Sequence, residues 1–195
     1  MKFVDPDGKV VRIPKADRTE VSKYINSRAA GIFGINRSGE LYLKKTEGSS
    51  GYSEYYRDRL VAAIKDPDII NISKSNFYTD KNGDKKDVDN DAGGGVTINK
   101  TLKRTDGNGN STTSKEADII FSGNENKKIK DTNGNALRDD PADIIMHEFL
   151  GHAIPWTVGT DTGNAIENEN KARKELGTGN DQQRKEDPDH KETTR

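Results

Sequence analysis

Apolar residues in the first half of the chain fall into short runs that favour three elements. Alternating apolar positions around a Ser-Gly turn predict a β-hairpin over residues 31–45. Tyrosines and aliphatic residues at helical spacing predict a helix over residues 52–65, which an Asp-Pro pair ends. The apolar run at residues 68–73 then predicts a short buried strand.

The second half of the chain predicts two strands and two helices. Residues 96–99 and 119–121 favour strands, which a Gly- and Asn-rich tip can join into a hairpin. An Asp-Pro pair caps a strongly apolar helix over residues 142–153, and an Asn caps a second helix over residues 165–176. Together these elements predict an α+β fold: a small twisted sheet, a long helix behind it, an active-site helix and a C-terminal helix.

A length of 195 residues is typical of one domain, which we place at residues 9–177. No large apolar residue follows Leu176, so residues 178–195 are expected to form a disordered tail.

The composition argues against several classes of partner. A net charge of −1 provides no general attraction for nucleic acid or for an anionic membrane. No apolar stretch approaches the roughly 18 residues that a membrane-spanning helix needs, and the start of the chain lacks the pattern of a signal peptide. The chain has no cysteine, so a metal ion would have to be held by His, Asp or Glu.

Two of the three histidines lie in the sequence HEFLGH at residues 147–152, inside the apolar helix. Ionisable side chains are costly to bury without a function, and zinc supplies one by binding imidazoles beside a carboxylate. The histidines are five positions apart, which on a regular α-helix leaves their side chains about 140° apart. A local π-type widening, eased by Gly151, would bring both onto one side, and we predict such a widening around residues 147–152.

This motif resembles the expanded His-Glu-Leu-Leu-Gly-His motif of dipeptidyl peptidase III, a zinc peptidase with one extra residue between its ligands. The resemblance implies a zincin-like fold with Zn²⁺ as cofactor. By matching positions it makes His147 and His152 metal ligands. It makes Glu148 the general base that takes a proton from the attacking water.

The layout around the motif is similar to toxin domains at the C-termini of Rhs-type repeat proteins. There a Gly-His-Ala helix end, here residues 151–153, is followed by a helix with Glu-Asn, here Glu169 and Asn170. The stretch VDPDG at residues 4–8 resembles the end of the Rhs core. The resemblance implies that residues 1–8 are the end of a larger carrier.

A catalytic zinc usually has three protein ligands, and the third must come from elsewhere in the chain. We predict Glu169, because small alanines share its helix face and permit a close approach. Glu167 and Asp161 are the alternatives, Asn170 is expected to orient a ligand, and His190 lies in the expected tail.

The sequence therefore predicts a zinc metallopeptidase that acts as the toxin or effector domain of a larger secreted or injected bacterial protein. Two alternatives stay open: a cell-wall peptide hydrolase, and a non-catalytic interaction domain of a surface repeat protein. The expected partner is a polypeptide substrate, paired along the strand at residues 96–99 or 119–121. The chain is expected to be a monomer, and an immunity protein is a further conceivable partner.

Overall fold

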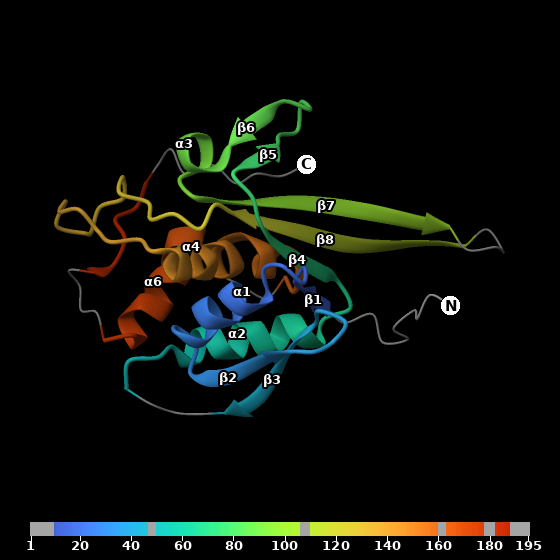
Figure 1. Ribbon diagram of the computed structural model, residues 1–195, viewed down its shortest axis with the longest axis horizontal. Helices are drawn as coiled ribbons and strands as arrows, with labels where there is room; N and C mark the ends of the chain where they lie inside the picture. The colour runs from blue at the N-terminus through green and yellow to red at the C-terminus, as the bar shows by residue number, and fades with distance from the viewer. Residues whose placement is uncertain (1–9, 47–49, 106–109, 160–162, 178–181, 188–195) are drawn as a thin grey trace.

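A four-stranded mixed sheet carries the fold (Figure 1). The computed structural model describes residues 10–46, 50–105, 110–159, 163–177 and 182–187. The sheet has the order β1-β4-β8-β7, in which β1, β4 and β8 run parallel and β7 runs antiparallel to β8. The strands are β1 (Val10–Arg12), β4 (Ile69–Lys74), β7 (Gly95–Thr105) and β8 (Ser111–Phe121). The predicted strands at 68–73, 96–99 and 119–121 are thus confirmed, with β7 and β8 longer than expected.

Two small antiparallel ribbons flank this sheet. One pairs β2 (Gly31–Ile35) with β3 (Leu41–Thr46) and confirms the hairpin predicted over residues 31–45. The other pairs β5 (Phe77–Thr79) with β6 (Lys85–Asp87) and stands above the start of β7 (Figure 1).

All three predicted helices are present, and the described residues contain two further helices that were not predicted. They are α1 (Arg18–Asn26), α2 (Glu54–Lys65), α3 (Val88–Ala92), α4 (Pro141–His147), a π-helix η1 (Glu148–Ala153), α5 (Ile154–Thr157) and α6 (Ala165–Glu175). The helix predicted over residues 142–153 is the run α4-η1, which α5 continues. Neither α1 nor α3 was predicted. The α+β fold class is confirmed.

The hydrophobic core lies between one face of the sheet and the helices α2, α4, η1 and α5. Alternate positions on β4 and β8 point into it, including Ile70, Ile72 and Ile119, all 1% exposed or less. Phe149 and Leu150 of η1 are fully buried against them. Burial of each such side chain stabilises the folded state by roughly 1.5–3 kcal/mol. The buried Phe149 and Leu150 therefore hold η1 against the sheet.

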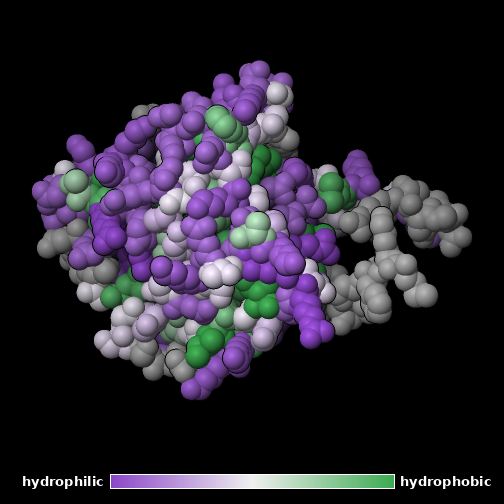
Figure 2. All heavy atoms as spheres, in the orientation of Figure 1, coloured by the Kyte–Doolittle hydropathy of each residue, from purple (hydrophilic) through white to green (hydrophobic). Residues whose placement is uncertain are grey.

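The outer surface is polar, in keeping with a chain that is 33% charged. Figure 2 shows a face covered mainly by hydrophilic residues, with hydrophobic residues in small scattered groups. Within the described ranges, no helix has both the length and the apolar character that crossing a membrane requires. The expected carrier end at residues 1–8 lies outside the described residues.

Candidate metal centre

The first turn of α4 fixes where the motif helix begins. The Asp140 side chain accepts hydrogen bonds from the backbone N–H groups of Ala142 (2.9 Å) and Asp143 (3.2 Å), as its predicted role as N-cap requires. Arg28, just after α1, donates to Asp140 at 2.8 Å and to Asp143 at 2.7 Å. This pairing ties the start of the motif helix to the first helix of the chain.

The motif helix widens where its spacing predicted. Residues Glu148–Ala153 form a π-helix between the α-helical segments α4 and α5. The extra residue per turn brings His147 and His152 onto one side, with their Nε2 atoms 3.3 Å apart. The predicted widening is therefore confirmed.

Gly151 has a packing role in this segment. A Cβ built on Gly151 would lie 2.7 Å from the Cβ and 3.1 Å from the Cα of Ala165. The missing side chain lets the start of α6 lie directly against η1. Helix α6 is thereby brought close enough for Glu169 to reach His147.

The distance between the two imidazoles matches shared metal coordination. Two nitrogens that each lie 2.0–2.1 Å from a tetrahedral zinc are about 3.3–3.4 Å apart. The observed Nε2–Nε2 separation is 3.3 Å, and both rings are buried. Together with Glu148 they form a group whose ligand atoms lie within 4.8 Å of one another. These residues fit a metal ion.

Glu169 contacts the other nitrogen of His147. Its Oε2 lies 2.7 Å from His147 Nδ1, while its Oε1 accepts from Arg173 Nε at 2.5 Å. Arg184 Nη1 lies 3.4 Å from the same Oε2. A carboxylate on Nδ1 favours the tautomer with its proton there, which leaves the Nε2 lone pair of His147 available for a metal ion.

Two arginines and two carboxylates lie together behind His147, namely Arg173, Arg184, Glu169 and Asp139. Burial alone would raise the pKa of Glu169, but Arg173 and His147 outweigh it and the pKa is lowered. Arg173 also pairs with Asp139 at 2.9 Å. Burial, and next the charge of Glu169, raise the pKa of Asp139 to about 8 despite that ion pair. We conclude that Glu169 is the carboxylate that stays ionised in this cluster.

Glu148 points the other way, toward the sheet. Thr97 on β7 donates from Oγ1 to Glu148 Oε2 at 2.6 Å. Burial raises the pKa of Glu148 above its ordinary value, although His147 and Thr97 oppose the shift. A carboxylate with a raised pKa, held beside two imidazoles, suits a residue that accepts and returns a proton.

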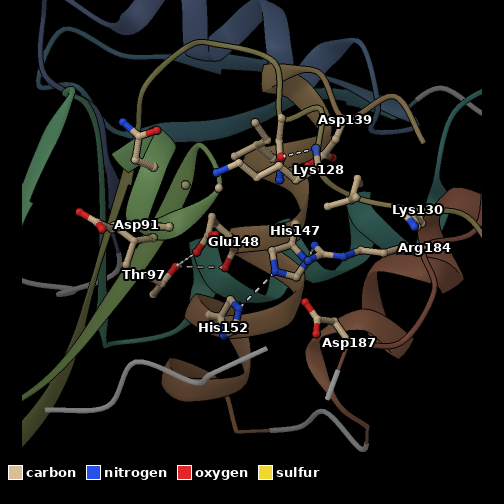
Figure 3. Close-up of a pocket in the computed structure, with 18 of the residues that line it drawn as sticks. Asp91, Thr97, Lys128, Lys130, Asp139, His147, Glu148, His152, Arg184 and Asp187 are labelled. Carbon is tan, nitrogen blue, oxygen red and sulfur yellow. Dashed lines mark hydrogen bonds between the residues drawn. The ribbon is translucent and has the colours of Figure 1, made fainter. Parts of the chain in front are cut away.

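A cavity of about 740 Å³ opens over these side chains (Figure 3). Its floor carries His147, Glu148 and His152, and β7 forms one side. The 126–130 loop and the 184–187 segment form much of the remaining wall. His147, Glu148 and His152 are thus buried side chains that a peptide-sized ligand can reach through the cavity.

The residues considered as the third metal ligand differ in where they lie relative to the two histidines. Glu169 lies at the Nδ1 side of His147, away from the Nε2 pair, so its assignment as a metal ligand stays a prediction. Glu167 is exposed and accepts from the backbone N–H of Asn164 as part of the cap of α6. Asp161 and His190 lie outside the described residues.

Asn170 was expected to orient a ligand, which stays a prediction, and in the structure it holds the chain that follows α6. Its Oδ1 accepts from Arg184 N at 2.7 Å, and its Nδ2 donates to Arg184 O at 2.8 Å. Residues 182–187 belong to the segment expected to be a disordered tail, yet the structure places them against the site. The rest of that tail lies outside the described residues.

Three residues at the site were missed by the sequence analysis: Thr97, Arg184 and Asp187. Thr97 carries no local signal beyond its place in a predicted strand next to three glycines. Arg184 and Asp187 lie in a polar stretch without apolar periodicity. Only the spatial pairing of that stretch with α6 reveals them.

Comparisons with protein-family models, with curated proteins and with solved structures find no match for this chain.

Proposed function

We propose that this chain is a zinc-dependent peptidase. The observation that carries the proposal is the pair of imidazoles at the spacing of shared zinc coordination, with Glu148 beside them at the floor of an open cavity. Imidazole and carboxylate ligands without cysteine suit zinc among the common metal ions. When bound, zinc supplies Lewis-acid activation of water and of the scissile carbonyl.

In this proposal each residue of the chain has a distinct task. His147 and His152 hold the ion through Nε2, and Glu169 keeps His147 in the required tautomer. Glu148 accepts the proton of the attacking water and returns it to the leaving amine. Thr97 holds the Glu148 carboxylate in position, because its hydroxyl donates to Oε2.

An extended peptide fits the geometry beside Glu148. Of the two strands considered from sequence, β8 lies inside the sheet between β4 and β7, whereas β7 is an edge strand. Val96 and Thr97 of β7 line the cavity. A substrate that adds to this edge would run past Glu148 and present its backbone to the two histidines.

We further propose that the domain acts as the toxin or effector of a larger secreted protein and meets its substrate in another cell. This part rests on the resemblance of residues 4–8 and 140–177 to Rhs-type toxin domains. Expression of the chain in bacteria tests it. Growth should stop with the wild type and continue with Glu148→Gln, and equal growth with both would contradict the toxin role.

The peptidase proposal is tested by metal analysis and cleavage of an unfolded protein such as reduced casein. We expect one zinc per chain and cleavage by the wild type. Glu148→Gln should keep the zinc and lose at least about 10³-fold in rate, because proton transfer and water orientation are both lost. Glu54→Gln, which changes an exposed carboxylate on α2, is the matched control and should behave as wild type.

Two results would overturn the peptidase proposal. A chain without stoichiometric zinc would be a non-catalytic interaction domain. A zinc-loaded chain that spares casein but cuts the stem peptides of purified peptidoglycan would be a cell-wall hydrolase.

A further inference from the structure

One wall of the cavity is rich in positive charge. It is built from the 126–130 loop and from the chain that follows α6, which lie side by side because Lys185 N donates to Lys130 O at 2.9 Å. Four cationic side chains of these two segments line the cavity, and we call them the basic wall: Lys128, Lys130, Arg184 and Lys185.

Arg184 is the buried member of the basic wall, and it is held in place from two directions. Asn170 Oδ1 accepts from Arg184 N at 2.7 Å, and Asn170 Nδ2 donates to Arg184 O at 2.8 Å. Arg184 is only 9% exposed, and its Nη1 lies 3.4 Å from Glu169 Oε2 and 3.5 Å from His147 Nδ1. Figure 3 shows the guanidinium meeting His147 from the side opposite to Thr97. A fixed positive charge therefore lies beside the histidine pair.

One edge of the Arg184 guanidinium is unused by the protein. Both side-chain contacts, to Glu169 and to His147, are made by Nη1. Within the described ranges, Nε and Nη2 donate to no other group, and neither is a fully enclosed atom without a partner. Because Arg184 lines the cavity, these donors are open to a ligand there. Nε and Nη2 form the edge of a guanidinium that a carboxylate binds with two parallel hydrogen bonds.

The lysines add positive charge on the same wall. Lys128, Lys130 and Lys185 are exposed, and none of them forms an ion pair with a carboxylate of the described residues. The carboxylates of these two segments that line the cavity are Glu186 and Asp187, and each has an interaction of its own. Four cationic side chains thus face two engaged carboxylates, which favours an anionic ligand on this side of the cavity.

We propose that the basic wall binds a carboxylate of the peptide substrate, on an Asp or Glu side chain or at the C-terminus, with Arg184 as the residue that contacts it. The inference rests on the proposed peptide substrate and names the class of peptide that the site prefers. A peptide paired with β7 would lie on the Thr97 side of the histidines. A carboxylate that extends across the cavity would then reach Nε and Nη2 of Arg184.

The test measures binding of short fluorescent peptides by anisotropy, using the full chain with Glu148→Gln in zinc-containing buffer so that no peptide is cut. One peptide has a central Glu and an amidated C-terminus. A second has Gln and an amidated C-terminus, and a third has Gln and a free C-terminal carboxylate. We expect the Glu peptide or the free-end peptide to bind at least about 10-fold more tightly than the amidated Gln peptide, because a charge-assisted pair is gained. Which of the two binds tightly identifies the source of the carboxylate.

Two variants and a control locate the interaction. Arg184→Gln should abolish the preference, with zinc content and melting temperature measured alongside because Arg184 also contacts Glu169. The double variant Lys130→Gln/Lys185→Gln leaves Arg184 in place and should lower the preference about 3-fold, with a smaller effect at high salt. Lys127→Gln is the matched control, since this lysine belongs to the same loop but does not line the cavity, and it should keep the full preference.

Equal affinity for all three peptides would overturn the inference, and so would a folded Arg184→Gln chain that keeps the preference. If Arg184→Gln does not fold, an unchanged preference in the lysine double variant overturns it. Binding is measured without cleavage, so the two proposals fail separately. A chain that prefers a carboxylate but whose wild type cleaves nothing would refute the peptidase alone. A wild type that cleaves casein without any such preference would refute the basic wall alone.

Discussion

At the scale of single residues, Gly95 determines how closely Glu148 approaches the sheet. A Cβ on Gly95 would lie 3.1 Å from both Cγ and Oε1 of Glu148, and 2.6 Å from Cγ2 of Ile144. All of these groups are buried, so none can move away cheaply. The glycine at the start of β7 therefore allows the Glu148 side chain to lie where it does.

We expect Gly95→Ala to lower the rate of peptide cleavage by about 10–100-fold while one zinc stays bound, because Glu148 is displaced but the histidines are not. The overpacking should also lower the free energy of unfolding by about 1–3 kcal/mol. Rate, zinc content and urea unfolding would be measured together. Gly34→Ala is the control, since the three atoms nearest its new methyl group all belong to the half-exposed Tyr42 ring, which can turn aside. An unchanged rate in Gly95→Ala would show that Glu148 does not depend on this contact.

Residues of the site that are neighbours in sequence could be predicted, and residues that meet only in the folded chain could not. His147, Glu148 and His152 were identifiable because they are neighbours in sequence on an apolar helix. Thr97 donates to Glu148 across 51 positions, and Arg184 reaches His147 across 37. Such contacts depend on how the elements pack, which a single sequence does not encode locally.

Among the elements, the widened helix was predicted from sequence spacing alone. A helical pattern with ligands five apart required a π-type segment, and η1 supplies it. The same pattern could not tell which of the two strands, 96–99 or 119–121, forms an edge. That outcome depends on β4 pairing in parallel with β8, a long-range contact that leaves β7 outside.

The register of β7 allows the edge to be tested. Ser122 N donates to Gly94 O, so the alternation of an antiparallel ladder turns the backbone groups of every second residue inward, beginning at Gly94. The N–H groups of Thr97 and Asn99 then face the free edge. A substrate strand would pair with these groups.

We expect Asn99→Pro to lower kcat/KM for extended peptides by at least about 10-fold, because it removes one outward N–H without breaking the bonds to β8. Asn99→Ala changes the same side chain but keeps the N–H, and serves as the reference. Zinc content and melting temperature should be similar in the two variants. Equal kcat/KM values would exclude β7 as the strand that binds substrate.

At the scale of the whole molecule, the site joins parts of the chain that lie far apart in sequence. The walls of one cavity are formed by β7, the α4-η1 helix and residues 182–187. Helix α6 supports them through Glu169 and Asn170. Residues 182–187 were expected to be disordered because they lack large apolar residues. They are held instead by hydrogen bonds to α6 and to the 130–132 loop, and by the buried Arg184. Polar docking of this kind has no periodic signature in a sequence.

A metal ion held by this cavity should stabilise the entire domain, because binding occurs in the folded state and not in the unfolded chain. With free zinc at about 100 times its Kd, the gain is about 2.7 kcal/mol, which for a domain of this size raises Tm by about 5–10 °C. Calorimetry in zinc and in a chelator would measure it. His152→Ala should melt at one temperature in both buffers, since it lacks one of the two imidazoles. If the wild type also shows no difference, the two histidines do not share an ion, and their 3.3 Å separation reflects packing alone.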